Sequence, residues 1–542
     1  MFTDNKKIFL AHKEILELLD KRVSNFKNRY RQNIAIIGKE GTGKTSLLLQ
    51  FLNNYSFEEG TVPIYLEFKK EDSFDYFARQ FIKKLLFYFL RTKWQTPKEE
   101  NFEFDFLIQQ AKRYIPQTIR DILQIRDCLK DKKNDLVYSS ILKLPYLLTQ
   151  ESGAKLIIFF DEFHCLGYFK IASPFLILAK EVVIQKDVLY ILTSSSVNLA
   201  QKILSQKLSL LLGSFEVVKI EPFDFKTAGE FLRQKNEWIS ISPACRNFLI
   251  TFTNGYPSYL TAISARIKLV AQEKRVSYIS FPLLQRCLYE ELFLEDGQIN
   301  QLLLRRINNI KNQYFDDFIY ILFSLAEGNK KITEISKKTG KKRKDVSKFL
   351  FHLIKKDIIY KNGLFYGFED SLLKFWLNNS YRLKREDPSF NLGYAKKEFL
   401  NRIERLFSDF TSETKTDILE RVKNLLKCWQ NEILLIDNKK YKLPHFASVR
   451  VESLQTLIAQ EKNRYWIGEI EKRRVSPKVI KEFIEKCKKV NHKHRVTRRF
   501  LIALKEVEID AKILAKEEKI WILGLKQLNF LLDFYGRFKI IG

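Results

Sequence analysis

A glycine-rich segment between two apolar stretches constrains the fold of this chain more than any other feature. Residues 34–49 read IAIIGKEGTGKTSLLL: four apolar residues, then the spacing G-x-x-x-x-G-K-T, then three leucines. Glycine permits the positive φ angles that let backbone N–H groups approach an anion closely. The segment therefore predicts a buried strand, a phosphate-binding loop and a helix whose N-terminus faces the phosphates.

Each position of this loop has a predicted chemical role. Lys44 would reach the β- and γ-phosphates of a nucleoside triphosphate, and the Thr45 hydroxyl would bind Mg²⁺. Backbone N–H groups along the loop would surround the β-phosphate. We therefore expect ATP and Mg²⁺ as cofactors. The residues expected to contact the nucleotide are Gly38, Lys39, Glu40, Gly41, Thr42, Gly43, Lys44, Thr45 and Ser46.

A second apolar stretch ends in the acids that such a loop requires. Residues 155–164 read KLIIFFDEFH, which predicts a buried strand leading to Asp161 and Glu162. Asp161 would hold Mg²⁺ through water, and Glu162 would orient and deprotonate the attacking water. The alternative is a strand that simply ends in two solvated acids. The phosphate-binding loop upstream favours the catalytic interpretation.

A third apolar stretch ends in small hydroxyl residues. Residues 187–196 read DVLYILTSSS. In ATPases with an extra strand between the loop strand and the acidic strand, this tip carries a polar sensor of the γ-phosphate. Thr193 or Ser194 would fill that role, and we count Ser194 among the catalytic residues. The alternative is that the serines cap the next helix.

These segments, followed by FEVVKIEPFDFKTAGEFL and TNGYPSYL, occur in the order seen in the archaeal-type ATPases. From about residue 8 to residue 380 the chain resembles that family, which belongs to the signal-transducing (STAND) branch of the AAA+-like P-loop ATPases. Its layout is also similar to that of the origin-recognition initiators. The resemblance implies an α/β P-loop core with a parallel sheet of ASCE-type strand order and a helical lid. It places Gly255 and Pro257 of the lid near the adenine.

The chain departs from this family at one position. The family often has a Gly-Arg pair before its fifth strand, and the arginine assists hydrolysis or senses the nucleotide. Here Ser214 stands at that position, and Lys202 and Lys207 are the nearby cations that could substitute. We therefore expect ATP binding with slow hydrolysis.

The middle of the chain is strongly basic. Residues 315–377 predict three helices, the second ending at Gly340, and then a two-strand hairpin with an Asn362–Gly363 turn. This order is typical of a winged helix-turn-helix, in which the N-terminal residues of the third helix enter the major groove of DNA. The alternative is a winged helix used only for packing or protein contacts. The candidate DNA contacts are Lys341, Lys342, Arg343, Lys344 and Lys348.

The C-terminal part resembles the PD-(D/E)xK nuclease-like fold that ends many archaeal-type ATPases. In that fold one strand supplies an acid and the next supplies Glu-x-Lys, which bind Mg²⁺ and steady the attacking water. Glu469 sits correctly, but Glu471 replaces the lysine, and Lys472 is expected to point to the opposite strand face. Upstream, Glu452 lies near the place where an aspartate is required. We therefore predict a nuclease fold without nuclease chemistry.

Composition narrows the class of partner. The formal net charge of +30 favours a polyanion, either nucleic acid or an anionic membrane surface. The six cysteines show no zinc or disulfide spacing, so we expect free thiols and a cytoplasmic protein. No apolar run reaches the length of a membrane span, and no signal peptide is recognised, so we expect no membrane insertion.

The sequence thus predicts a modular ATPase switch that couples its nucleotide state to DNA or partner binding through the winged helix. A nucleotide-dependent oligomer and a protein partner stay open. One alternative is an ATP-gated DNA nuclease effector of a mobile-element or defence system, and another is a signalling scaffold that binds no nucleic acid. The expected domains are an ATPase core at 1–225, a helical lid at 226–313, a winged helix-turn-helix at 314–381, a linker at 382–394 and a nuclease-like domain at 395–542.

Overall fold

The computed structural model describes residues 12–55, 60–93, 102–208, 215–386, 392–437, 439–453, 455–491 and 495–540. Contacts divide the chain into two compact units, and each is described by itself. Unit 1 comprises Met1–Phe223, Tyr256–Ser258 and Lys355–Asp357, and unit 2 comprises Asp224–Gly255, Tyr259–Ile354 and Ile358–Gly542.

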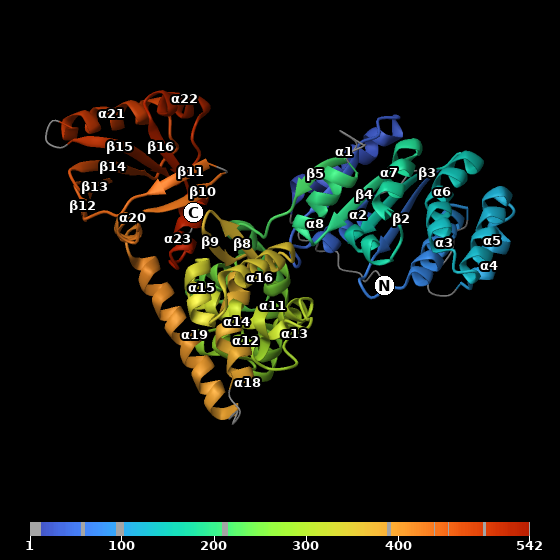
Figure 1. The fold of residues 1–542 in the computed structure, drawn as a ribbon, viewed down its shortest axis with the longest axis horizontal. Coiled ribbons are helices and arrows are strands. Elements are labelled where there is room, and N and C mark those ends of the chain that lie inside the picture. Colours follow the sequence, from blue (N-terminus) through green and yellow to red (C-terminus); the bar gives the residue numbers. More distant parts are fainter. Residues whose placement is uncertain are drawn as a thin grey trace. The chain divides into compact units, whose positions relative to one another are not determined.

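A five-stranded parallel sheet forms the centre of unit 1 (Figure 1). Its strand order is β2-β3-β4-β1-β5, so β4 lies between the strand before the glycine-rich loop and the strand that ends in the acids. The parallel sheet with an inserted strand, expected from the sequence, is confirmed. The strands are β1 Asn33–Ile37, β2 Thr61–Glu67, β3 Lys155–Asp161, β4 Val188–Ser194 and β5 Phe215–Lys219.

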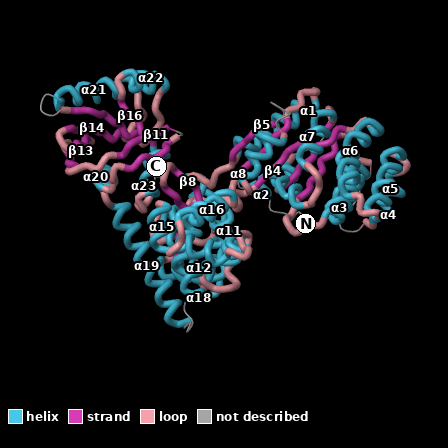
Figure 2. The backbone as a smooth tube through the Cα atoms, viewed as in Figure 1, coloured by secondary structure: helices cyan, strands magenta, loops and turns pink. Residues whose placement is uncertain are grey.

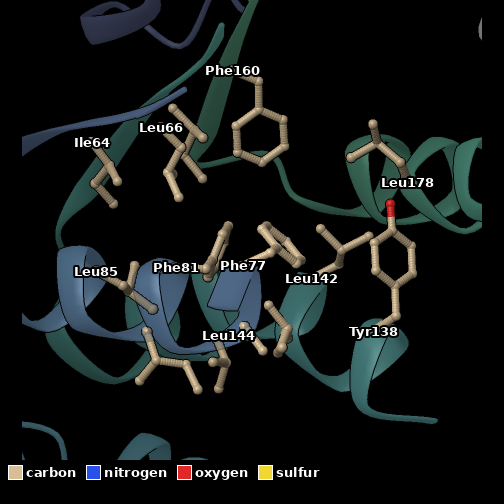
Figure 3. Packing of buried hydrophobic residues seen from close by; sticks show 14 of the residues in the cluster. Ile64, Leu66, Phe77, Phe81, Leu85, Tyr138, Leu142, Leu144, Phe160 and Leu178 are labelled. Carbon is tan, nitrogen blue, oxygen red and sulfur yellow. The ribbon is translucent and has the colours of Figure 1, made fainter. Parts of the chain in front are cut away.

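Helices cover both faces of this sheet. Alternate residues of a strand point to opposite faces, and here the residues on both faces are apolar and pack against helices. Ile34 and Ile36 of β1 pack in the core that contains α1 and α2 side chains, whereas Ala35 and Ile37 belong to the core on the other face. Figure 3 shows part of that second core, which contains side chains of α3, α6 and α7. The helices of unit 1 are α1 Lys13–Lys27, α2 Lys44–Asn54, α3 Phe74–Arg91, α4 Phe104–Ala111, α5 Pro116–Lys130, α6 Asn134–Ser152, α7 Pro174–Ile184 and α8 Val197–Lys202, with a 3₁₀ turn at Phe163–Tyr168 and a π-helical turn at Ile203–Lys207.

Unit 2 begins with a helical region. Two short parallel strands join the loops between these helices, since Ser240 lies opposite Tyr278 in the register. The elements are α9 Phe225–Lys235, β6 Ser240–Ile241, α10 Pro243–Phe252, α11 Pro257–Lys274, β7 Tyr278–Ile279, α12 Phe281–Leu292 and α13 Gln298–Asn308.

Three helices and a hairpin follow, in the order that the sequence predicts. The second helix ends at Gly340, whose φ of 69° supplies the left-handed cap that favours glycine. The hairpin turns at Asn362–Gly363, and Gly363 has a φ of 60°. The elements are α14 Phe315–Ala326, α15 Ile332–Thr339, α16 Arg343–Lys355, β8 Ile359–Asn362, β9 Phe365–Phe368, α17 Ser371–Trp376, a π-helical turn at Leu377–Tyr381 and α18 Arg382–Glu386.

A second five-stranded sheet, with order β12-β13-β14-β15-β16, forms the C-terminal part (Figure 2). The pairs β12–β13 and β13–β14 are antiparallel, and β14–β15 and β15–β16 are parallel. The elements are α19 Leu392–Lys415, α20 Ile418–Lys427, β10 Glu432–Ile436, β11 Lys439–Leu443, β12 Ser448–Val451, β13 Thr456–Glu461, β14 Arg464–Glu471, α21 Pro477–Asn491, β15 Val496–Ala503, α22 Ile509–Glu517, β16 Ile520–Gly524 and α23 Leu525–Phe534.

Three further expectations can be compared with the structure. In the segment expected as a linker, residues 382–386 form α18, and α19 begins at residue 392. All six cysteines are free thiols. Among the helices in the described ranges, none combines the length and apolar character needed to span a bilayer.

Candidate functional site

The glycine-rich loop connects β1 to α2, and its glycines are required by its geometry. Gly41 and Gly43 have φ angles of 83° and 93°, in the left-handed region that favours glycine. A Cβ atom at Gly38 would lie 2.1 Å from Ile220 Cγ2 and 2.6 Å from the Ile220 carbonyl oxygen. The loop can therefore turn this tightly only with glycine at these positions.

Lys44 lies inside this loop. Its ammonium group donates to the carbonyl oxygens of Gly38 at 2.9 Å and Lys39 at 3.0 Å, and the residue is 4% exposed. Burial lowers the pKa of Lys44 from its ordinary value, although the charges of Glu162 and Asp161 oppose that effect. The loop thus carries a desolvated positive charge at its centre, which suits phosphate binding.

The carboxylate of Asp161, fully buried at the end of β3, gathers hydroxyl groups from three elements. Thr45 Oγ1 donates to Oδ2 at 2.7 Å, and Tyr65 OH donates to the same oxygen at 2.8 Å. Thr193 Oγ1 donates to Oδ1. A carboxylate beside a hydroxyl at the end of a phosphate-binding loop is the all-oxygen donor set that Mg²⁺ prefers, so the predicted pair Thr45 and Asp161 fits this ion.

Glu162 is held by the tip of β4. Its Oε2 accepts hydrogen bonds from the Ser195 N–H at 2.7 Å and the Ser195 hydroxyl at 2.8 Å, and it lies 3.2 Å from His164 Nδ1. Burial alone would raise the pKa of Glu162, but the hydrogen bond with His164 and the charge of Lys44 outweigh it and lower this pKa to about 2. Glu162 is therefore ionised, and the carboxylate oxygen Oε2 already has three partners.

The two candidate sensor hydroxyls at the end of β4 are buried and already hydrogen-bonded. Thr193 Oγ1 bonds Asp161 and accepts from the Glu162 N–H at 3.2 Å. Ser194 Oγ lies 2.9 Å from His164 Nδ1. Ser196 is the N-cap residue of α8, but its side chain makes no capping hydrogen bond. The structure therefore places Thr193, rather than Ser194, against the acids.

Comparison with known proteins agrees with this geometry. Residues 14–263 match the family model described as an ATPase domain predominantly from Archaea. This segment is an archaeal-type ATPase domain. The assignment rests on that match and on the sheet order, and no curated protein matches the sequence.

Several solved structures are similar in fold to the chain that carries this ATPase domain. A Walker-type ATPase of Pyrococcus abyssi is 18% identical, with a TM-score of 0.48, covering 69% of this chain and 99% of its own. The ORC2 protein of Aeropyrum pernix, solved as ADPNP–ADP complexes, is 12% identical, with a TM-score of 0.42, covering 71% and 98%. The ORC1 protein of the same organism, solved in complex with DNA, is 13% identical, with a TM-score of 0.39, covering 71% and 96%.

Pro257, which the family resemblance places near the adenine, and its neighbour Ser258 lie at the glycine-rich loop. The segment Tyr256–Ser258 groups with unit 1, and the Ser258 N–H donates to the Gly41 carbonyl oxygen at 3.2 Å. A Cβ atom at Gly43 would lie 3.9 Å from Pro257 Cγ. Gly255, with a φ of 71°, provides the turn before α11.

Ser214 stands where the archaeal-type ATPases often have an arginine, and Lys202 and Lys207 are the nearby cations considered as substitutes. Ser214 lies outside the described residues. Lys207 lies over the Phe175 ring, 5.5 Å from its centroid, and Lys202 ends α8.

Most of the candidate DNA contacts of unit 2 are exposed. Lys341 instead forms an ion pair with Asp317 at 2.5 Å. Phe351, on the same helix α16, is an aromatic side chain that is 59% exposed. The exposed candidates are Lys342, Arg343, Lys344 and Lys348.

The tip of the hairpin is covered by the C-terminal part of unit 2. The Asn362 side chain donates to the Leu435 carbonyl at 2.8 Å and accepts from the Leu435 N–H at 2.6 Å. A Cβ atom at Gly363 would lie 2.9 Å from the Ile433 carbonyl oxygen. Phe365 belongs to the core of the C-terminal sheet. The sequence did not reveal these contacts, because their partners lie about seventy residues further along the chain.

The acids of the C-terminal sheet are neutralised by basic neighbours. Glu469 is 3% exposed, and its Oε1 pairs with Lys486 Nζ of α21 at 2.5 Å. Its Oε2 is buried and has no hydrogen-bond partner among the residues that the structure describes. Glu471 is also buried and pairs with the Arg473 guanidinium at 3.2 Å. A lysine therefore does stand beside Glu469, but it comes from a helix rather than from position 471.

Glu452 and Lys472, the other residues considered for the nuclease motif, form ion pairs of their own. Glu452 is exposed and lies 3.7 Å from Arg450 Nε. Lys472 pairs with Asp417 at 3.6 Å. Across the part of the chain that the structure describes, no group of three His, Cys, Asp or Glu residues is placed to hold a metal ion.

Proposed function

We propose that this protein is a slowly hydrolysing ATP switch whose nucleotide state controls DNA binding through a winged helix. The observation that carries the ATPase part is the meeting of Thr45, Asp161 and Lys44 at the end of the parallel sheet. The winged-helix part is supported by the order of α14, α15, α16 and the β8–β9 hairpin.

The engagement of Glu162 supports slow turnover. A general base must reach the proton that it abstracts, within hydrogen-bonding distance or through one water. Here Glu162 Oε2 is already bonded to Ser195 and close to His164. In our proposal ATP is held by the loop, Mg²⁺ when bound neutralises phosphate charge beside Thr45 and Asp161, and hydrolysis waits until Glu162 leaves Ser195.

The N-terminal end of α16 is our proposed DNA surface. Its exposed cations are suited to phosphate contacts, which provide affinity more than sequence discrimination. The hairpin tip is hydrogen-bonded to β10. In this arrangement we therefore expect α16, rather than the hairpin, to make the DNA contacts.

The DNA-binding part is tested with a triple Lys342, Arg343 and Lys344→Ala variant and labelled duplex DNA. Each lost phosphate contact lowers the slope of log K against log salt by about 0.9, so we expect the slope to fall by about 2 to 3. Fluorescence anisotropy across a salt series measures it.

A control triple, Lys439, Lys440 and Lys442→Ala, removes the same charge from three exposed positions of β11. We expect the control to keep a slope close to that of the wild type. An equal decrease of the salt slope in both triple variants would show that DNA binding depends only on the total charge of the protein. That result would contradict a DNA site on α16.

A DNA-cleaving effector is the second candidate, because Lys486 places a lysine beside the buried Glu469. It predicts Mg²⁺-dependent nicking of plasmid DNA that disappears in Glu469→Ala. We favour binding without cleavage, since Glu471 is paired with Arg473 and no group of three His, Cys, Asp or Glu residues that could hold a metal ion occurs among the described residues.

A signalling scaffold that binds protein instead of nucleic acid is the third candidate. It would show no salt-dependent DNA binding at all, in either nucleotide state. A protein partner and a nucleotide-dependent oligomer are compatible with the switch and would add to it.

A further inference from the structure

The buried carboxylate of Asp161 has a hydrogen-bond donor that the phosphate-loop and acidic motifs do not include. Tyr65 lies in β2, the edge strand next to β3, and its hydroxyl donates to Asp161 Oδ2 at 2.8 Å. Thr45 donates to that same oxygen at 2.7 Å. The Tyr65 hydroxyl therefore reaches the side of the carboxylate that faces the proposed Mg²⁺ ligand.

We infer that Tyr65 is a positioning residue for Mg²⁺: it fixes the orientation of the Asp161 carboxylate for the metal-bound nucleotide. This inference rests on the proposed ATP and Mg²⁺ site and extends it to a residue of a different strand. In this proposal Tyr65 acts on the metal site through Asp161, to which its hydroxyl donates a hydrogen bond.

The surroundings of Asp161 explain why a third donor matters. The residue is fully buried, so each lone pair without a donor costs free energy. Thr193 engages Oδ1 from β4, and Thr45 and Tyr65 engage Oδ2 from α2 and β2. Donors on both oxygens, from three elements, oppose rotation of the carboxylate about its side-chain bond.

The backbone of β2 also holds Tyr65 in place. In the sheet register Tyr65 lies opposite Phe159, and Glu67 lies opposite Asp161. Lys84 of α3 donates to the Tyr65 carbonyl oxygen at 3.0 Å, and its ammonium lies 5.6 Å from the ring centroid. The pairing of β2 with β3 thus holds the Tyr65 backbone, and Lys84 contacts both the Tyr65 carbonyl oxygen and the ring.

The test compares ATP affinity with Mg²⁺ and with EDTA for the wild type and Tyr65→Phe. Removing one hydrogen bond to a charged group should reduce the Mg²⁺-dependent gain in ATP affinity about 3- to 10-fold. Affinity in EDTA should stay unchanged, because the loop that holds the phosphates is intact. A fluorescent ATP analogue measures the dissociation constants, and the shift of the melting temperature with MgATP provides a second readout.

Tyr190→Phe is the matched control, since it removes a fully buried tyrosine hydroxyl of β4 that bonds Gln185 at 2.6 Å and lies outside the site. We expect this control to keep the wild-type gain. An unchanged gain in Tyr65→Phe, an equal loss in the control, or equal losses with Mg²⁺ and EDTA would overturn the inference. A wild type that binds no ATP in either condition would instead overturn the proposed function itself.

Discussion

At the scale of single residues, Glu162, the proposed general base, is held by Ser195 and His164. The same Oε2 accepts the Ser195 N–H and hydroxyl and lies 3.2 Å from His164. Glu162 also has a left-handed backbone conformation, with a φ of 59°. The hydrogen bonds from Ser195 tie the Glu162 side chain to the tip of β4, which lies directly beside the loop strand β1. The rate of hydrolysis should therefore depend on how strongly Ser195 holds this side chain.

Replacing Ser195 by alanine should speed ATP hydrolysis about 3- to 10-fold, because one hydrogen bond that holds Glu162 is removed. Steady-state phosphate release at saturating ATP measures the rate. Ser196→Ala is the control, since the Ser196 hydroxyl bonds Asp357 instead. A rate that falls in Ser195→Ala would mean that Ser195 positions Glu162 for catalysis rather than restraining it.

Replacing Glu162 by glutamine should lower the hydrolysis rate about 100-fold or more, because the amide cannot accept the proton of the attacking water. ATP affinity should be nearly unchanged, since glutamine is of similar size and the loop is intact. Single-turnover hydrolysis and equilibrium binding of the same preparation separate the two effects. An unchanged rate would assign the handling of water to another group.

The site residues that could be predicted from the sequence are those placed by local spacing. Lys44, Thr45 and Asp161 could be predicted because a phosphate-binding loop and an acidic strand end each have a recognisable pattern. Tyr65 and His164 could not, because their roles depend on which strands become neighbours and on where the side chains meet. Their contacts with Asp161 and Glu162 exist only in the folded sheet.

At the scale of elements, the hairpin and the C-terminal sheet share one set of contacts. Asn362 forms two hydrogen bonds with the backbone of Leu435, and Phe365 packs in the same core as β10 and α23 residues. The turn that a free hairpin would present to solvent is therefore part of an interface within unit 2. We expect the hairpin and β10 to unfold together.

Replacing Asn362 by alanine should lower the free energy of unfolding of this interface by about 1 to 3 kcal/mol, because the N–H and C=O groups of Leu435 lose their partners. Hydrogen exchange at residues 359–368 and 432–436 measures it, and both segments should exchange faster together. Leu364→Ala is the control, since Leu364 is 74% exposed beside the same turn. Faster exchange in the hairpin alone would contradict a shared unit.

Helix and strand positions could largely be predicted where the hydrophobic periodicity agrees with residues that end helices or form turns. The helix stop at Gly340 and the Asn362–Gly363 turn are confirmed, because glycine with a positive φ has a clear local signature. The polar segment at 382–394 is instead predicted to be a linker, yet its residues 382–386 form a helix. Its charged residues form ion pairs within unit 2, such as Arg382 with Glu327, which a polar sequence alone does not indicate.

At the scale of the whole molecule, a basic chain combines an archaeal-type ATPase domain with a second unit that carries an exposed basic helix. The formal net charge of +30 provides a general attraction for polyanions, but it cannot by itself respond to a nucleotide. A switch requires that ATP bind two states of the protein with different affinity, and this coupling is reciprocal. If ATP changes DNA affinity, DNA must change ATP affinity by the same factor.

DNA affinity with and without ATP, for the wild type and Lys44→Ala, tests the central claim most directly. We expect ATP to change the wild-type affinity about 5-fold or more, the usual lower range of such couplings. Lys44→Ala should bind DNA equally with and without ATP, at the affinity of the nucleotide-free wild type, because the loop has lost its phosphate-binding charge. A wild type whose DNA affinity is the same in both conditions would contradict the switch.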